Sequence, residues 1–442
     1  MRRILRGVHV PHSKNTAGSV PTRMPPPRFI TIPLVMHIGA PSVCVVKPGD
    51  HVDVGQLIAE AGGYVGAPIH SSVSGTVREI TSVMMTNGKP VPAVKIESDG
   101  LMTVSPSIKP PVVNDYDSFI AAVRASGAVG LGGAGFPTSV KLDIKDTSRI
   151  KEVIVNSAEC EPYITSDTRT MIDRADDIAE GCRLLEKYLN VKKIYIGIEK
   201  NKPEAIASMR RIAANDPVVE VRVLPSLYPQ GGEKVIIHNI TGKVVPEGKL
   251  PIDVGTIVIN CTTLAFIASY IKTGMPLVEK CITVDGPAVA SPKNVIVPIG
   301  TAMSEVFEFC GGFKKAPAKF LQGGPMMGLA VFSPDTPVIK NNNAILAFDK
   351  DTASKPKETS CIRCGQCSAH CPYKLDPAEY GRALKANDVE KLIRLKVNLC
   401  MECGCCSYIC PARIPLVQQN KMGKALVAEY QKKKKTEAGA AK

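Results

Sequence analysis

Eight cysteines near the C-terminus are the residues of this sequence best suited to chemistry. They form two copies of the pattern C-x2-C-x2-C-x3-C-P: Cys361, Cys364, Cys367 and Cys371 in the first, and Cys400, Cys403, Cys406 and Cys410 in the second. In such a run three thiolates bind one 4Fe-4S cluster, and the fourth binds the other cluster. By this rule one cluster takes Cys361, Cys364, Cys367 and Cys410, and the other takes Cys400, Cys403, Cys406 and Cys371. The sequence therefore predicts an electron-transfer protein with two 4Fe-4S clusters.

Zinc is the alternative metal for Cys-x2-Cys pairs. A zinc site needs four ligands, whereas this array holds two sets of four, each ending in Cys-Pro, so the pattern favours clusters. Cys405 lies inside the second copy but off its spacing, and we expect it not to be a ligand. Because no apolar run follows the basic N-terminus, we expect no signal peptide, and the 15 cysteines then indicate metal or redox chemistry rather than disulfides.

A glycine-rich loop is the second feature with chemical potential. Gly130, Gly132, Gly133 and Gly135 fit G-x-G-x-x-G, but a helical pattern precedes them and no helix clearly follows Pro137. The dinucleotide motif needs a strand before the loop and a helix after it, so this is not a Rossmann fingerprint. The glycines indicate a backbone that approaches a flat or phosphate-bearing ligand. A tight loop at a domain joint is the alternative.

Three polar segments each follow a predicted strand. They begin at Asn156 ("NSAECEPY"), Tyr228 ("YPQGGEK") and Asn260 ("NCTT"). In an α/β fold, ligands bind beyond the carboxyl ends of the strands. These groups suit the edge of a flavin ring, a ribityl chain and a phosphate.

The elements that must position these residues predict a multidomain protein of α/β and β units. Residues 1–28 read as an extended arm, and short β runs over 29–112 resemble the barrel-sandwich hybrid of lipoyl domains, without a lysine at the hairpin tip. Helices at 117–125 and 175–189 alternate with strands at 152–156, 193–198, 219–224 and 257–259, which predicts an α/β domain over 113–275. Residues 276–350 resemble the β-grasp (SLBB) domain, 351–425 resemble an α-helical dicluster ferredoxin domain, and 426–442 read as a basic disordered tail.

The formal net charge of +14 does not by itself identify the class of binding partner. No nucleic-acid motif and no basic patch interleaved with aromatics accompany it, so we expect no nucleic-acid partner. A basic surface equally suits an anionic membrane, a dinucleotide or an acidic redox partner. The most apolar stretch, 256–271, is too short and too polar to span a bilayer, so we expect a soluble or peripheral protein.

The glycine loop, the segments "NSAECEPY" and "YPQGGEK", the N-terminal barrel and the dicluster module together resemble a known family. The likeness is to the NADH-oxidising flavin subunit of respiratory complex I, and more closely to the RnfC family of the Rnf complex. It extends over nearly the whole chain. Two positions depart from the complex I pattern: Leu131 stands in place of an arginine, and Ala158 in place of an acidic residue. The complex I motif of four cysteines is also replaced by two such motifs.

The resemblance implies a non-covalent FMN, with NAD(H) as substrate and no side chain as catalyst, because FMN itself carries out hydride transfer. The FMN cradle would be formed by Gly130, Gly132, Gly133 and Gly135. Asn156, Glu159 and Cys160 would line the other side of the flavin, Gly231, Gly232 and Glu233 would lie by its ring, and Asn260 and Thr263 near its phosphate. Phe136, Lys141 and Glu161 would face the nicotinamide nucleotide, Phe136 by stacking and Glu161 by binding ribose hydroxyls. The alternatives without a ligand are that Glu159 and Glu161 are solvated loop carboxylates and that Lys141 is a surface lysine.

The implied function is the NADH-site subunit of a membrane-bound ferredoxin:NAD+ oxidoreductase that translocates ions. Its implied place is peripheral, on the cytoplasmic face of a bacterial cell membrane, with the other Rnf subunits as partners and ferredoxin as an indirect one. One alternative is a cobalamin reductase built from similar modules. Another is an electron wire or adaptor without a working flavin site. The ion, the direction of electron flow and the subunit that contacts the clusters stay open.

Overall fold

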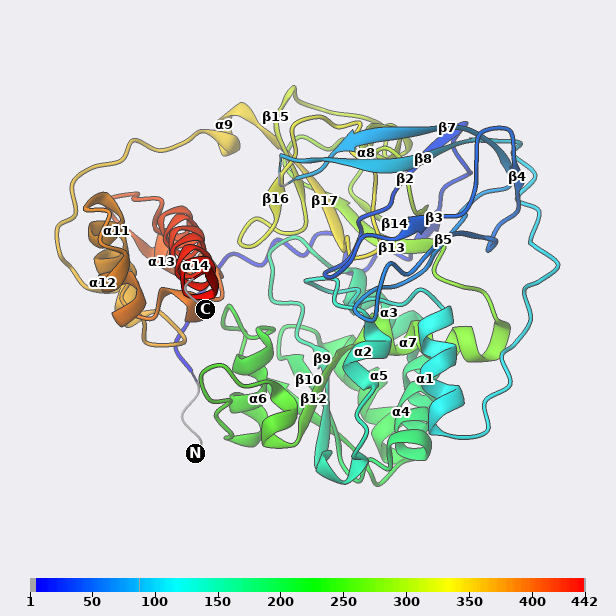
Figure 1. Cartoon of the computed structure of the whole chain (residues 1–442), viewed down its shortest axis with the longest axis horizontal. Coiled ribbons are helices and arrows are strands. Elements are labelled where there is room, and N and C mark those ends of the chain that lie inside the picture. Colours follow the sequence, from blue (N-terminus) through cyan, green and yellow to red (C-terminus); the bar gives the residue numbers. More distant parts are fainter. Residues whose placement is uncertain (1–4, 87, 441–442) are drawn as a thin grey trace.

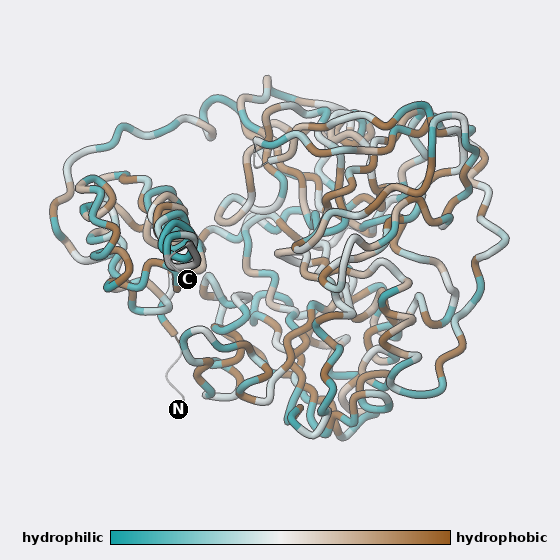
Figure 2. Tube along the Cα trace, viewed as in Figure 1, coloured by the Kyte–Doolittle hydropathy of each residue, from teal (hydrophilic) through white to brown (hydrophobic). Residues whose placement is uncertain are grey.

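Four apolar runs form a parallel sheet at the centre of the α/β domain. The computed structural model describes residues 5–86 and 88–440. The strands lie in the order β11 (Val219–Leu224), β10 (Ile194–Glu199), β9 (Glu152–Ser157) and β12 (Thr256–Asn260). β9 is buried along nearly its whole length, as is usual for a central strand of a parallel sheet with both faces covered. In Figure 2 the hydrophobic trace gathers on these strands.

Helices cover both faces of this sheet. One face carries the large core cluster of Phe119, Ile178 and Leu264, and the other packs on Ile236 and Ile240. The helices and short 3-10 turns of the domain are α1 (Tyr116–Ala125), α2 (Thr138–Leu142), η1 (Thr147–Arg149), α3 (Ser166–Asp173), α4 (Ala175–Leu189), α5 (Pro203–Ala214), α6 (Glu233–Thr241), η2 (Pro251–Val254) and α7 (Cys261–Thr273). The expected strands and the two expected helices are present, with ends that differ by at most one residue.

Two small antiparallel sheets form the N-terminal barrel. One has the order β2 (Phe29–Pro33), β8 (Pro90–Ser98), β7 (Gly75–Met84), β4 (His51–Val52), and the other β3 (Val43–Cys44), β5 (Leu57–Glu60), β6 (Ile69–His70). Ile30, Ile58 and Ile96 lie among the buried residues between them. The Leu131 side chain of the glycine loop packs into this same cluster, so the barrel supports the loop directly.

A six-stranded sheet forms the third domain. Its order is β1 (Thr22–Arg23), β14 (Lys293–Pro298), β13 (Glu279–Asp285), β17 (Ala344–Asp349), β15 (Pro317–Gln322) and β16 (Leu329–Ala330). Two short helices accompany it, α8 (Met303–Phe309) and α9 (Lys350–Ala353). β1 comes from the N-terminal arm and pairs in parallel with β14 at the edge of the sheet. The arm is therefore bound to other domains of the chain.

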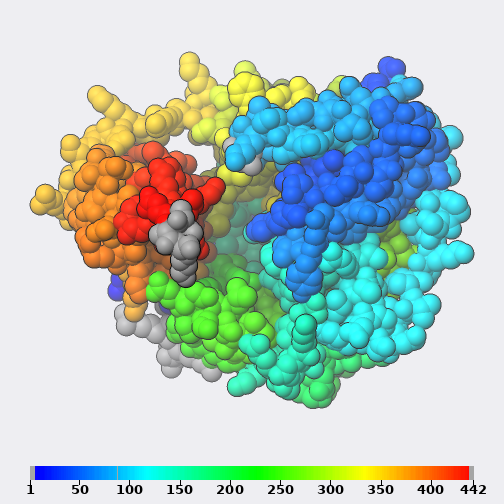
Figure 3. All heavy atoms as spheres, viewed as in Figure 1, coloured from blue at the N-terminus to red at the C-terminus, as the bar shows by residue number. Residues whose placement is uncertain are grey.

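The cysteine motifs lie in a small helical lobe. It consists of α10 (Gln366–Ala369), α11 (Pro377–Lys385), α12 (Val389–Arg394), η3 (Val397–Leu399), α13 (Cys405–Ile409) and α14 (Leu416–Ala440). An exposed segment after α9 leads to this lobe around the outside of the molecule (Figure 1). In Figure 3 the lobe, in orange and red, lies beside the green segment around α6. The ion pair of Lys396 with Glu247 joins the same two parts.

The expectation of a disordered tail over 426–442 is wrong for its described part. α14 continues without a break to Ala440. The residues there are mostly lysine, alanine, glutamate and glutamine, which are good helix formers even where nothing packs on them. Glu429 and Lys433 add an ion pair at the helical spacing of four residues. No helix in the described residues is long and apolar enough to cross a membrane.

Candidate functional site

The polar segments meet at the carboxyl edge of the parallel sheet. Asn156 at the end of β9 lies opposite Asn260 at the end of β12. The Asn156 side chain donates to the carbonyl of Gly231, with 2.9 Å between Nδ2 and O. The Gly231 amide in turn donates to Cys160 Sγ at 3.3 Å. Asn156, Cys160 and Gly231, which the sequence assigned to the flavin site, are therefore brought together.

The glycine loop closes on itself beside this edge. Gly130 donates to the carbonyl of Phe136 at 2.9 Å, and the Leu131 amide donates to Thr263 Oγ1 at 2.9 Å. On the other side Lys280 Nζ donates to the Leu131 carbonyl at 2.8 Å. Leu131, which replaces the arginine of complex I, is thus an anchor of the loop. Lys280 lies far along the chain, and no motif in the sequence pointed to it.

The exposed tip of this loop has the form of a cradle. Residues 132–134 are exposed, and the space next to a Cβ on Gly133 is open. A Cβ on Gly132 would collide with the amide of Asn260, and Gly135 has φ +68° with Asn341 beside it. These glycines therefore have a structural cause, and the open tip fits a flat ligand such as a flavin.

A helix does open after the loop, contrary to expectation. α2 starts at Thr138, and Pro137 stands at its N-cap, where a missing N–H costs no hydrogen bond. The element before the loop is α1 rather than a strand, so the Rossmann motif remains excluded. α2 directs Lys141 to Glu233 at the first position of α6, with 2.8 Å between Nζ and Oε1. Phe136 lies half-buried in the loop before α2.

Asn260 and Thr263 lie at the N-terminus of α7, next to the glycine loop. Asn260 caps the helix by accepting from the Thr263 amide at 3.1 Å. Its Nδ2 also donates to the carboxylate of Asp167 at 2.7 Å, and Thr262 Oγ1 donates to the same carboxylate. A helix N-terminus attracts a phosphate, but here a carboxylate already lies close to it. Sequence reasoning missed Asp167, because it comes from α3.

The two glutamates of "NSAECEPY" have protein partners. Glu159 caps α3, accepting from the Asp167 amide at 2.6 Å and from the Thr168 hydroxyl. Glu161 accepts from the amides of Met326 and Met327 in the third domain, at 3.0 and 2.7 Å. Burial raises the pKa of Glu161 to about 7. Neither carboxylate is therefore a solvated loop group. The two amides use only part of the accepting capacity of the Glu161 carboxylate, so its ribose role stays a prediction.

The cysteines surround two cavities in the sets that the spacing predicted. A cavity of about 320 Å³ is lined by Cys361, Cys364, Cys367 and Cys410. A narrower one, of about 20 Å³, is lined by Cys371, Cys400, Cys403, Cys405 and Cys406. In the described part of the chain no three metal-ligating side chains converge on a point suited to a single ion. Each cavity offers four thiols of the predicted set, which is the donor set of a cubane, and the narrow cavity must widen to hold one.

Amide groups point at the sulfurs of the narrow cavity, here called the inner site (Cys371, Cys400, Cys403, Cys406). The Leu375 amide donates to Cys371 Sγ and the Glu402 amide to Cys400 Sγ, both at 3.4 Å. The fully buried Asn420 donates through Nδ2 to Cys400 Sγ at 3.4 Å. Such N–H···S bonds stabilise negative charge on an iron–sulfur cluster. Asn420 lies outside both motifs, so spacing alone could not find it.

The inner site lies against residues 228–232, here called the flavin edge because the sequence assigned Gly231 and Gly232 to the flavin site. The Tyr228 hydroxyl donates to the carbonyl of Cys403 at 2.8 Å, and a Cβ on Gly232 would touch Met401. The other cavity, here called the outer site, has Cys361 and Cys364 exposed to solvent. The inner site therefore lies next to residues 228–232, and the outer site reaches the surface of the molecule.

Known protein domains match separate parts of the chain. The Nuo51 FMN-binding domain matches residues 123–269, the RnfC barrel-sandwich hybrid domain 2–101, the SLBB domain 281–330, and the 4Fe-4S dicluster domain 358–414. The predicted fold class is therefore confirmed. The C component of the Na+-translocating ferredoxin:NAD+ oxidoreductase complex of Acetobacterium woodii is 42% identical over 85% of this chain and 86% of its own. This chain belongs to the RnfC family.

Other RnfC relatives agree over similar lengths. The corresponding component of the proton-translocating ferredoxin:NAD+ oxidoreductase complex of Clostridium ljungdahlii is 40% identical over 84% of this chain and 82% of its own. That of the ion-translocating oxidoreductase complex of Rhodobacter capsulatus is 39% identical over 97% and 84%. Among solved structures, an NAD+-reducing [NiFe]-hydrogenase covers 71% of this chain and 62% of its own, with a TM-score of 0.52 and 19% identity, which shows a shared fold. FMN and 4Fe-4S clusters are the cofactors that the matched RnfC domains are built to bind.

Proposed function

We propose that this chain is the NADH-site subunit of a membrane-bound ferredoxin:NAD+ oxidoreductase that couples electron transfer to ion translocation. Family membership and the FMN-binding and dicluster domains support the proposal. The observation that carries it is the contact between the flavin edge and the inner site, through Tyr228 on Cys403 and Gly232 beside Met401. This contact would place the flavin and one cluster on either side of a single packed boundary.

The chain's own residues would divide the work. The glycine loop would bear the flavin, with Asn156, Cys160 and Gly231 fixing the facing wall. Burial raises the pKa of the Cys160 thiol to about 12, so it stays neutral and presents no charge to the ring. Lys141 would attract the anionic nucleotide. FMN supplies the exchange between the two-electron chemistry of NAD(H) and the one-electron chemistry of the clusters.

The cysteines would bind the clusters as the two cavities group them, with Cys405 present but not a ligand. The inner site would exchange electrons with the flavin, and the outer site with other members of the Rnf complex. We place the chain at the cytoplasmic face of the cell membrane as a peripheral subunit, with ferredoxin as an indirect partner. The net charge of +14 supports that place, because basic proteins are attracted to anionic lipids.

Anaerobic titration of the purified full chain with NADH tests the proposal. We expect bound FMN, loss of its absorbance on adding NADH, and then the EPR signals of two interacting reduced clusters. If the chain binds no FMN after gentle purification and does not respond to NADH, the proposal is wrong. Clusters that dithionite reduces but NADH does not would indicate an electron wire.

A further inference from the structure

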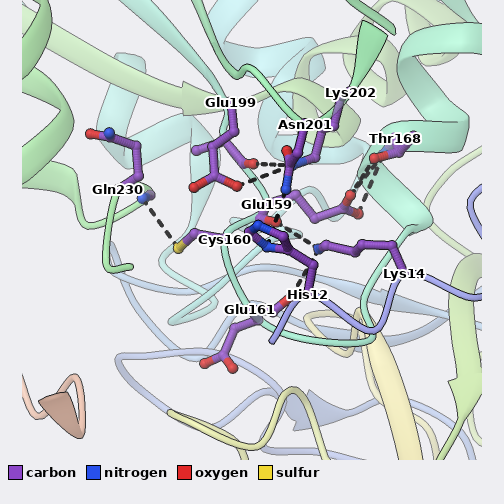
Figure 4. A network of polar contacts seen from close by, with 12 residues as sticks. His12, Lys14, Glu159, Cys160, Glu161, Thr168, Glu199, Asn201, Lys202 and Gln230 are labelled. Atoms are coloured by element: carbon purple, nitrogen blue, oxygen red, sulfur yellow. Dashed lines mark hydrogen bonds and ion pairs between the residues drawn. The ribbon is translucent and has the colours of Figure 1, made fainter. Parts of the chain in front are cut away.

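The N-terminal arm places a lysine ammonium inside the wall of the flavin site. Lys14 Nζ donates to the backbone carbonyls of Glu159, Glu161 and Ile164, at 2.8, 2.8 and 2.6 Å. An ammonium has three N–H donors, and these contacts use all of them. Figure 4 shows the Lys14 side chain extending toward the Glu159 segment.

A second lysine binds the same segment from the other side. Lys202, which is buried, donates to the Ala158 carbonyl at 2.7 Å and pairs with Glu199 at 3.2 Å. Residues 158–164, here called the carbonyl loop, therefore turn four carbonyls toward two cations. Backbone carbonyls arranged around a positive charge form the kind of cage that otherwise holds a metal ion.

The carbonyl loop needs such support. Glu159 has φ +46° and Tyr163 has φ +70°, and neither is glycine. Positive φ is strained at such residues and persists only where the surroundings impose it. The loop also carries Cys160, whose sulfur accepts from Gly231 at the flavin edge. A change in the loop is thus passed to the flavin wall through one hydrogen bond.

The arm is held in place along its length. Val8 pairs with Tyr228, the His12 carbonyl accepts from the Tyr163 amide at 3.0 Å, and the hydroxyls of Thr16 and Thr165 lie 2.5 Å apart. Lys14 lies between these contacts, so its position is fixed by both neighbours. Burial lowers the pKa of Lys14 to about 8, with Glu159 the largest opposing influence, so the ammonium remains mostly charged at neutral pH.

We propose that Lys14 is a positioning residue of the flavin site: its ammonium fills a cage of three carbonyls and so holds the carbonyl loop in its FMN-binding form. The arm is then a part of the site rather than a linker to it. This inference rests on the proposed function, because it supposes that the flavin edge binds FMN.

FMN binding by Lys14→Ala tests the inference, measured through flavin fluorescence on the full chain with both clusters in place. The matched control is Lys272→Ala, which removes an exposed lysine from α7 in the same domain. We expect Lys14→Ala to bind FMN at least about tenfold more weakly, and the control to bind as the wild type does. Iron content and the thermal midpoint report whether each variant is folded.

Chemical rescue separates a cation in a cage from general loss of packing. Ammonium chloride should restore much of the FMN affinity of Lys14→Ala, because ammonium can donate to the three carbonyls. Tetramethylammonium chloride at equal concentration should not, because it has no N–H donors. Unchanged FMN affinity in Lys14→Ala, or a loss that both salts or neither restore, overturns the inference.

Tryptic cleavage of the wild type tests the same coupling if the variants fail to fold. Bound FMN should slow cleavage after Lys14 while leaving cleavage after the exposed Lys432 of α14 unchanged. Equal cleavage after Lys14 with and without FMN contradicts the inference. If the wild type itself binds no FMN, the proposed function fails instead, so the two failures are distinguishable.

Discussion

Lys141 on α2 and Glu233 at the start of α6 form an ion pair, with 2.8 Å between Nζ and Oε1. Lys141 Nζ also donates to the carbonyl of Val258 in the middle of β12, at 3.1 Å. The pair thus links the glycine loop to the segment that contacts the inner site. Both side chains are partly exposed, 32% for Lys141 and 41% for Glu233, so a bound nucleotide can reach them.

Lys141→Met should raise KM for NADH about tenfold and leave kcat within about twofold, because the lysine attracts substrate without taking part in hydride transfer. Partly exposed ion pairs contribute about 0–1 kcal/mol, so the free energy of unfolding should change little. Steady-state NADH oxidation with an artificial acceptor measures both constants. Lys145→Met, at an exposed position nearby, is the control. A fall in kcat with unchanged KM contradicts the assignment.

Glu161→Ala should lower stability rather than NADH affinity. The variant leaves the amides of Met326 and Met327 without their acceptor, and the partly buried Met326 amide costs about 1–3 kcal/mol if it stays unpaired. Denaturant unfolding measures the loss, with Glu60→Ala at an exposed strand end as the control. Unchanged stability together with a several-fold rise in KM for NADH would restore the ribose role that the sequence suggested.

Asn420→Leu should make the midpoint potential of the inner cluster more negative. The two motifs are related by repetition, and the residue ten positions after the fourth cysteine is Asn420 in the second motif and Gly381 in the first. Only the inner site therefore receives this side-chain N–H···S bond. Its loss disfavours the reduced cluster by about tenfold in the ratio of reduced to oxidised forms, or ~59 mV for one electron.

Spectroelectrochemistry with EPR resolves the two potentials. The control is Gln419→Ala, since Gln419 precedes Asn420 on α14 but lines the outer cavity. We expect the inner potential to be unchanged in this control. Equal shifts of both clusters in Asn420→Leu, or no shift, would show that the amide does not tune the inner site.

The buried Lys340 makes the free energy of unfolding depend on pH. It is fully buried at the junction of three domains, where Nζ donates to the carbonyls of Pro68 and Gly127, and burial lowers its pKa to about 7. The unfolded chain keeps the proton up to the ordinary pKa of 10.5. Between pH 7 and 10.5 the unfolded state therefore binds more protons, and stability rises with pH. Below pH 7 both states are protonated, and the cost of the buried charge is fully present.

The thermal midpoint of wild type relative to Lys340→Met should accordingly increase as the pH rises above 7. His70 lies beside Lys340, and burial lowers its pKa to about 3, so it stays neutral throughout this range. Lys109→Met, at an exposed position, serves as the control. A difference between wild type and Lys340→Met that is constant from pH 7 upward contradicts the prediction.

The local sequence pattern predicted those parts of the protein whose structure depends mainly on neighbouring residues in the chain. Apolar runs such as 194–199 are predicted as buried strands by their composition alone. The cysteine spacing gave two sets of four that line separate cavities, and Cys405 joins the second set in the lining of the narrow cavity. The residue-level assignments to FMN, NADH and the clusters remain predictions. The helical tail was missed because its lysines were taken for a charged coil, although they are also good helix formers.

What sequence reasoning missed depends on contacts between distant segments. Nothing near Lys14 in the chain indicates that it meets the carbonyl of Glu159, 145 residues away. Likewise the hydrogen-bond partners of Glu161 come from the third domain. A carboxylate that the sequence places in a polar loop therefore makes an interdomain hydrogen bond in the fold. Such pairs contribute stability only after several domains have packed, and no periodicity in the sequence indicates them.

The contacts of the N-terminal arm can form only in a certain order while the chain is synthesised. Thr22 and Arg23 are made early, yet they pair with Val295 and Ile296, which leave the ribosome long after the barrel and the parallel sheet. Lys14 must wait in the same way for the carbonyl loop. The two parts of the arm therefore meet their partners at different times, Lys14 before β14 is made and Thr22–Arg23 after it. A pause or truncation before β14 would leave Thr22 and Arg23 without their strand partners.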